Sequence, residues 1–230
     1  MKRVLSIAIV VLVAAVAGIA PAFAATVSYT TQASFLGAIT GAATANFDAD
    51  VAGTTIPNGT TVDGITFSSV IGGGNQLAIA NAFDTTSGLN YLGTTDTTSG
   101  GALFASDSVT MTFGSPVSAA GLFILSGNSL FANTFTLNIA GGNAQNSATQ
   151  DQILADGTYA YYIGITSSSS FSTATITLSS PGLPGDGPTW NVDDITTGTA
   201  NGTPPAVPEP ATCILLASGL GAMLRRRIKA

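Results

Sequence analysis

Hydrophobic and polar residues alternate along several stretches of this chain. Alternation with a period of two runs through residues 107–113, 158–166 and 171–179. That period is typical of β-strands with one buried face. Shorter stretches rich in β-branched and aromatic residues predict further strands at 26–30, 43–48, 64–70, 77–80, 117–125, 131–140 and 189–196.

Only one helix is predicted within this pattern. It follows Thr31 and places Phe35, Leu36 and Ile39 on its apolar side. Clusters of Gly, Asn, Asp and Ser, such as residues 72–75, connect the predicted strands. The helix-favouring residues Lys, Glu and Arg are scarce. We therefore expect an all-β body, an antiparallel β-sandwich, rather than a helical or βαβ protein.

The charges are unevenly placed along the chain. All 6 basic residues lie at the two ends, so the segment 4–224 contains the 12 acidic residues and no base. A body without cations has nothing to contact phosphate, which excludes nucleic acid as a partner. Histidine is absent, which excludes any catalysis that needs an imidazole.

The N-terminal segment 1–24 predicts a secretory signal peptide. A basic start is followed by a long apolar run and then by the small residues Ala22 and Ala24. Signal peptidase is expected to cleave before Ala25, which would begin the mature protein. The alternative is an uncleaved membrane anchor. The folded body then covers residues 25–199.

The C-terminal segment has three parts in a fixed order. A linker at 200–206 leads to the motif Val207, Pro208, Glu209 and Pro210, and an apolar stretch at 211–224 follows. That stretch is shorter than the ~20 residues of a comfortable membrane span, so it predicts a short transmembrane helix. A basic cluster closes the segment and should stay in the cytoplasm; it consists of Arg225, Arg226 and Arg227.

This C-terminus resembles the PEP-CTERM sorting signal of exopolysaccharide-producing bacteria. Pro208, Glu209 and Pro210 stand at the family's tripeptide, and the apolar helix and Arg cluster follow in the family's order over residues 207–230. The resemblance implies processing by an exosortase, an intramembrane cysteine transpeptidase. The precursor would be anchored in the inner membrane with its body in the periplasm, and the product would reach the cell surface. A plain C-terminal anchor with a Pro-rich stalk is the alternative.

The body also resembles the β-sandwiches commonly attached to this signal. The resemblance rests on the segments 46–48, 53–54, 63–67 and 190–195. Such bodies are similar in plan to galactose-binding-like jelly rolls, in which the first and last strands often lie together. This resemblance implies a fold and carries no activity with it.

Two close pairs of carboxylates are the candidate chemistry of the body. They are Asp48 with Asp50, and Asp193 with Asp194. Without Lys or Arg beside them, such carboxylates repel unless they are solvated, protonated or bound to a cation, and Ca²⁺ accepts carboxylate and backbone oxygens. If the first and last strands are neighbours, Asp48, Asp193 and Asp194 could hold one structural calcium ion. The alternative is that they occupy turns and strand edges in water.

Aromatic residues offer a second candidate site. Trp190 and the tyrosines at 159, 161 and 162 could form a platform on which a sugar ring stacks, or they could be core residues, as the alternation already suggests for Tyr159 and Tyr161.

Three classes of function fit these observations. The leading interpretation is a non-enzymatic, exported protein of the cell surface or the exopolysaccharide matrix. A calcium-dependent carbohydrate-binding module of the extracellular matrix is the alternative. A hydrolase that uses two aspartates is the third, although no partner that would raise the pKa of an acid is evident in the sequence.

Overall fold

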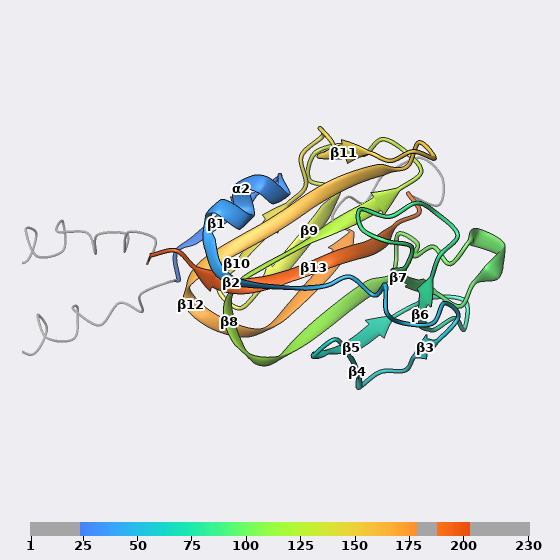
Figure 1. Cartoon of the computed structure of the whole chain (residues 1–230), viewed down its shortest axis with the longest axis horizontal. Helices are drawn as coiled ribbons and strands as arrows, with labels where there is room; N and C mark the ends of the chain where they lie inside the picture. The colour runs from blue at the N-terminus through green and yellow to red at the C-terminus, as the bar shows by residue number, and fades with distance from the viewer. Residues whose placement is uncertain (1–23, 179–187, 203–230) are drawn as a thin grey trace, which may run out of the picture. The chain divides into compact units, whose positions relative to one another are not determined.

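Strands make up nearly all of the body. The computed structural model describes residues 24–178 and 188–202, in which thirteen strands pair into one antiparallel sheet (Figure 1). The predicted fold class, an all-β antiparallel and sandwich-like body, is confirmed. The strands are β1 (Thr26–Tyr29), β2 (Ile39–Ala45), β3 (Thr55–Ile56), β4 (Thr60–Val62), β5 (Ile65–Val70), β6 (Leu77–Ala80), β7 (Tyr91–Thr94), β8 (Ser108–Ser126), β9 (Phe135–Ile139), β10 (Gly142–Gln145), β11 (Gln152–Ile153), β12 (Tyr159–Leu178) and β13 (Asn191–Ala200).

Two long strands, β8 and β12, form the spine of the sheet. They pair with each other along most of their length, and the register shifts on either side of Phe171. Pro116 lies beside this shift and is exposed. Because proline has no N–H to donate, the hydrogen-bonded ladder is interrupted there and both strands curve (Figure 1). The sequence predicted two separate strands in each of these regions; each pair is one continuous strand.

Because it is curved, β8 pairs with different strands along its two halves. Its first half pairs with β5, and its second half pairs with β13. The last strand, β13, in turn lies beside β2, with Ile195 opposite Ala45. The first strand, β1, pairs instead with β12. An early strand and the last strand are therefore neighbours, and this brings the segment after β2 close to β13.

The main core lies on the inner face of the curved sheet. Its residues follow the alternation seen in the sequence, with Met111, Tyr161 and Ile176 among them. Trp190 is fully buried in this core, its indole donates a hydrogen bond to the Phe104 carbonyl at 2.9 Å, and its ring packs on Phe135. Trp190, Tyr161 and Tyr162 are buried, so the alternative that they are core residues is confirmed and they form no sugar-stacking platform.

A second, smaller core lies on the opposite face of the same strands. It contains Phe35, Ile39, Tyr91, Ala119, Phe123, Leu125, Ala160 and Tyr162. The sequence did not predict this core, because alternation indicates one buried face and here both faces of the strands are buried.

One short helix, α2 (Gln32–Gly37), covers part of the second core. The Thr31 hydroxyl accepts a hydrogen bond from the Ser34 N–H and caps its first turn. Phe35 is its buried residue and packs against Tyr162. The helix ends before Ile39, which begins β2, so the prediction that Ile39 lies on the helix is wrong.

Several predicted features lie outside the described residues. They are the signal peptide with Ala22, most of the linker, and the segment with Val207, Pro208, Glu209, Pro210, Arg225, Arg226 and Arg227. Of the predicted cleavage site, Ala24 and Ala25 are described, and the Ala25 N–H donates to the Ser168 hydroxyl at 2.9 Å. In residues 24–178 and 188–202, no helix has the length and apolar character needed to cross a membrane.

Candidate functional site

The loop at 81–90 lies over two carboxylates of β13. The Thr86 N–H and hydroxyl both approach Asp193 Oδ2, at 2.8 and 2.6 Å. The next residue of the loop, Ser87, donates its hydroxyl hydrogen to Asp194 Oδ1 at 2.7 Å. The loop between β6 and β7 is thus fastened to the last strand by its two hydroxyl side chains.

An irregularity in β13 places both carboxylates under this loop. The pairing of β13 with β8 shifts in register between Asp193 and Thr196, and Asp194 has a positive φ of 46°. Successive residues of a regular strand point to opposite faces, but this bulge re-aims Asp194 toward the side of Asp193. Asp and Asn tolerate the left-handed region better than other residues with a side chain.

The two contacts of the Thr86 hydroxyl need one more hydrogen than that hydroxyl supplies. Its single hydroxyl hydrogen lies between Asp193 Oδ2 at 2.6 Å and Asp194 Oδ2 at 2.8 Å. The hydroxyl can donate to only one of them. The other contact becomes a hydrogen bond when that carboxyl carries a proton and donates it to the hydroxyl oxygen. The side chains therefore form a chain of two hydrogen bonds that needs one added proton.

Burial and charge favour the protonated state of this pair. Asp193 is 0% exposed, Asp194 is 6% exposed, and the body has no base to neutralise them. Burial, followed by the neighbouring charge of Asp194, raises the pKa of Asp193 to about 7, and the hydrogen bonds from Thr86 oppose this rise. Because the two groups are coupled, the proton belongs to the pair.

A buried tyrosine shares the face of the sheet with the carboxylate pair. Tyr162 lies opposite Phe123, and Phe123 lies opposite Asp193. Burial raises the pKa of Tyr162, and the charges of Asp151 and Asp194 raise it further. Its hydroxyl has no hydrogen-bond partner within the described part of the chain. Tyr162 therefore stays a neutral phenol and adds no charge beside the pair.

Asp48 binds the same loop at a different point. Its Oδ1 accepts hydrogen bonds from the N–H groups of Leu89 and Asn90, at 2.8 and 3.2 Å. A Cβ on Gly88 would collide with the Asp48 carboxylate, and Gly88 has a positive φ of 47°. Only glycine allows the loop to approach Asp48 so closely.

The structure brings the three predicted calcium ligands to one loop without joining them at one point. Asp193 and Asp194 meet around Thr86, whereas Asp48 accepts from backbone N–H groups three and four residues further on. In residues 24–178 and 188–202 there is no group of three His, Cys, Asp or Glu side chains that could hold a metal ion. Calcium therefore stays a prediction. Sequence reasoning missed Thr86 and Ser87, since nothing in the sequence indicated that their loop crosses β13.

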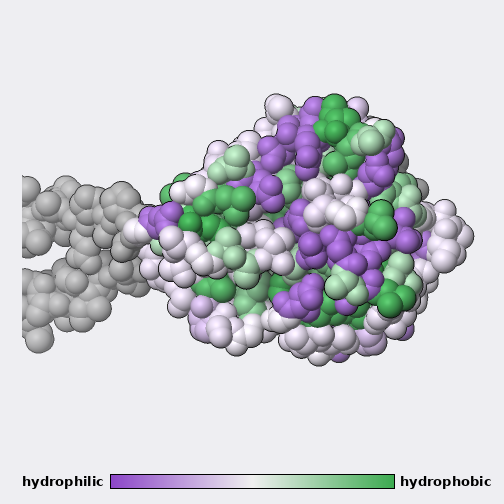
Figure 2. Space-filling view, viewed as in Figure 1, coloured by the Kyte–Doolittle hydropathy of each residue, from purple (hydrophilic) through white to green (hydrophobic). Residues whose placement is uncertain are grey.

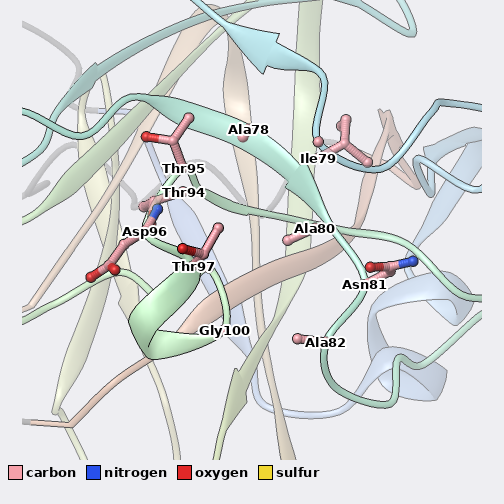
Figure 3. A pocket seen from close by; sticks show the side chains of 12 residues that line it. Ala78, Ile79, Ala80, Asn81, Ala82, Thr94, Thr95, Asp96, Thr97 and Gly100 are labelled. Carbon is pink, nitrogen blue, oxygen red and sulfur yellow. The ribbon is translucent and has the colours of Figure 1, made fainter.

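A hollow of about 340 Å³ lies between the end of β6 and the residues that follow β7 (Figure 3). One wall is the end of β6 with Ala80, Asn81 and Ala82, and the other is the turn 94–101, which contains the short 3₁₀ helix η1 (Thr97–Ser99). Sequence reasoning did not predict this hollow, because its walls come from turn residues without a recognisable motif.

Comparison with known proteins leaves the chain without a family. No family model matches it, and no curated protein matches it. Among solved structures, similarity was found to the catalytic domain of a GH87 alpha-1,3-glucanase in complex with nigerose, with a TM-score of 0.32, and to variants of that domain in complex with tetrasaccharides, with TM-scores of 0.32 and 0.33. Each is 16% identical, and the match covers 67% of this chain and 31% of that chain.

One prediction is corrected by this comparison. The body was expected to be non-enzymatic, but the similar structures are catalytic domains, so that expectation is contradicted and withdrawn. A likeness of this size assigns no reaction to the chain. The resemblance of the C-terminus to the PEP-CTERM signal stays a prediction, since no family model bears on it.

Proposed function

We propose that this chain is the precursor of an exported protein of the cell surface or the exopolysaccharide matrix. The observation that carries the proposal is the placement of the basic residues. All 6 lie at positions 2, 3, 225, 226, 227 and 229, on the outer side of the two hydrophobic segments. By the positive-inside rule, both ends of the precursor face the cytoplasm and the body lies across the membrane.

The C-terminal motif supports trimming of this precursor. Pro208 and Pro210 have no N–H and disfavour helical or sheet hydrogen bonding, so the sequence predicts an extended Glu209 next to the hydrophobic segment. An extended, accessible segment suits a processing enzyme. We propose signal peptidase as the partner at the N-terminal end and an exosortase-type transpeptidase at the C-terminal end, with transient attachment to the inner membrane between the two cleavages.

The charge and composition of the body are suited to an extracellular polysaccharide matrix. Its acidic residues have no base beside them anywhere from residue 4 to 224, and Thr and Ser residues are abundant. A net negative charge keeps a protein soluble and prevents self-association. Such a body is expected to remain dispersed in a hydrated extracellular matrix.

Intact-mass analysis of the exported protein tests this proposal. We expect a product that begins at Ala25 and lacks the Arg225, Arg226 and Arg227 tail, in cells that contain the transpeptidase. Replacing Pro208, Glu209 and Pro210 together by Ala should leave the tail attached. The matched control replaces the linker prolines Pro204 and Pro205 by Ala and should be processed normally. Recovery of full-length protein from the cytosol would contradict the proposal.

A further inference from the structure

We propose that the hollow between β6 and the 94–101 turn binds one unit of a neutral carbohydrate. This inference concerns the described body alone and does not depend on how the chain is exported. It rests on the shape of the hollow, on the polar groups at its rim and on the charge of the body.

The floor of the hollow is built from residues with almost no side chain. One wall contributes Ala78, Ala80 and Ala82 to this floor, and the other wall contributes Gly100 and Gly101 (Figure 3). A Cβ on Gly101 would lie 2.9 Å from the Ala80 Cβ, so a larger residue would fill the space. Both glycines have a positive φ, of 68° and 82°, which favours glycine at these positions. The result is a shallow apolar floor of the kind that meets the C–H face of a sugar ring.

One tyrosine holds the two walls together. The Tyr91 hydroxyl donates to the Gly100 carbonyl at 2.8 Å and accepts from the Ala82 N–H at 3.2 Å. Tyr91 itself is fully buried. Because each wall is tied to the same rigid side chain, the hollow is formed before any ligand arrives, and a preformed site loses little entropy on binding.

The rim carries polar groups that are free to bind. Asn81 and Thr97 are exposed, and their side chains make no hydrogen bond to another described residue. The Asp96 carboxylate is held in place by the Thr98 hydroxyl and N–H at 2.6 and 2.9 Å, which lower its pKa and keep it ionised. An amide, a hydroxyl and a carboxylate together can donate to and accept from the hydroxyl groups of a sugar.

The charge of the body limits the class of ligand that the hollow can bind. The segment 4–224 contains no Lys or Arg, so nothing in the body can neutralise an anionic sugar such as a uronate. The rim presents one carboxylate, and that carboxylate is already engaged by Thr98. A neutral ligand with several hydroxyl groups therefore fits better than an anion.

Phe83 adds an aromatic surface at the border of the hollow. Its side chain is 39% exposed, stacks on Tyr91 and lies next to Gly100.

Titration calorimetry of the purified protein tests the proposal. The probes are tetrasaccharides of glucose, mannose and galactose, with a glucosamine tetrasaccharide as the cationic probe and a galacturonate tetrasaccharide as the anionic one. We expect at least one neutral probe to bind, and the anionic probe not to bind. Binding should be the same in calcium and in chelator, because only one carboxylate lines the hollow.

Variants locate the binding at the hollow. The double change Asn81→Ala and Thr97→Val should lower the affinity for the neutral probe at least tenfold. It should leave the melting temperature unchanged, since both side chains are exposed. Gln152→Ala removes an equally exposed amide on β11 and should bind as the unchanged protein does. The proposal is overturned if no neutral probe binds, if only the cationic probe binds, if binding requires calcium, or if the double variant binds equally well. An error in the export proposal would change the mass of the chain ends and leave this affinity as it is.

Discussion

Replacing Asp194 by Asn is expected to stabilise the protein at pH 8, by roughly 2 kcal/mol. The amide nitrogen takes the place of Oδ2, which lies 2.8 Å from the Thr86 hydroxyl. It donates the hydrogen that this contact lacks, and the Thr86 hydroxyl then donates to Asp193. Oδ1 still accepts from Ser87. The change also removes one of two buried negative charges. Denaturant unfolding at about pH 5 and pH 8 measures the effect.

Asp194→Ala is the matched control for this substitution. It removes the same charge but keeps neither hydrogen bond, and it places a Cβ without a polar group at a φ of 46°. The left-handed region costs such a residue about 1–2 kcal/mol. We expect the Ala variant to be less stable than the unchanged protein at both pH values. An Asn variant that is also less stable at pH 8 would show that the pair needs no added proton.

The shared proton gives the unchanged protein a definite pH dependence. The folded pKa of Asp193 is about 7, above its ordinary value of 3.8, so the native state holds the extra proton between these values and the unfolded chain does not. The free energy of unfolding therefore falls as the pH rises through this window, with about a tenfold change in the folding equilibrium per pH unit for one proton. In Asp194→Asn we expect this slope to become shallower, because the charge of Asp194 is gone while the burial of Asp193 remains.

Gly93→Ala is expected to destabilise the body by about 2–3 kcal/mol. Gly93 lies in β7, and a Cβ there would collide with the Gly101 carbonyl oxygen and lie 3.1 Å from the Tyr91 ring. That carbonyl accepts from the Thr94 N–H at 2.7 Å. The backbone has to move apart, because neither neighbour is a flexible side chain. Thermal and denaturant unfolding measure the change.

A second glycine supplies the control for that prediction. A Cβ on Gly127, in the turn after β8, meets no atom within 4 Å. Gly127→Ala should change the free energy of unfolding by less than about 0.5 kcal/mol. If Gly93→Ala were equally neutral, the close approach of β7 to Gly101 would be wrong, and with it the wall of the hollow.

The sequence predicted the strands and core residues that alternation reveals, where one face of a strand is buried. Alternation placed Met111, Tyr161 and Ile176 in a core, and all three are in the main core. The second core was not predicted, because the alternation through 158–166 indicated one buried face, whereas Tyr162 on the other face is buried as well and packs with Phe123. Short strands such as β7 and β11 were missed for a related reason, since a few residues carry no measurable pattern.

The candidate site could be predicted only in part. The absence of bases in the sequence indicated that the charges of Asp193 and Asp194 must be compensated by solvation, protonation or a bound cation. Both side chains are buried, so solvation by water does not compensate them. The identity of their partner could not be predicted, since Thr86 is more than a hundred residues away and reaches them through a loop shaped by Gly88. Asp107 lies between two serines in the sequence, which gives no sign of burial, yet it is buried and accepts hydrogen bonds from the backbone N–H groups of Gly72 and Phe104, because two loops close over it.

Carboxyl ¹³C NMR of aspartate-labelled protein, titrated in the presence of a chelator, tests the shared proton most directly. We expect Asp193 to titrate near pH 7. In Asp194→Asn the titration of Asp193 should move to lower pH, because the neighbouring charge is removed while the burial of Asp193 remains. If every aspartate of the folded protein lost its proton below about pH 5, the buried pair would carry two negative charges and the proposed sharing of a proton around Thr86 would be wrong.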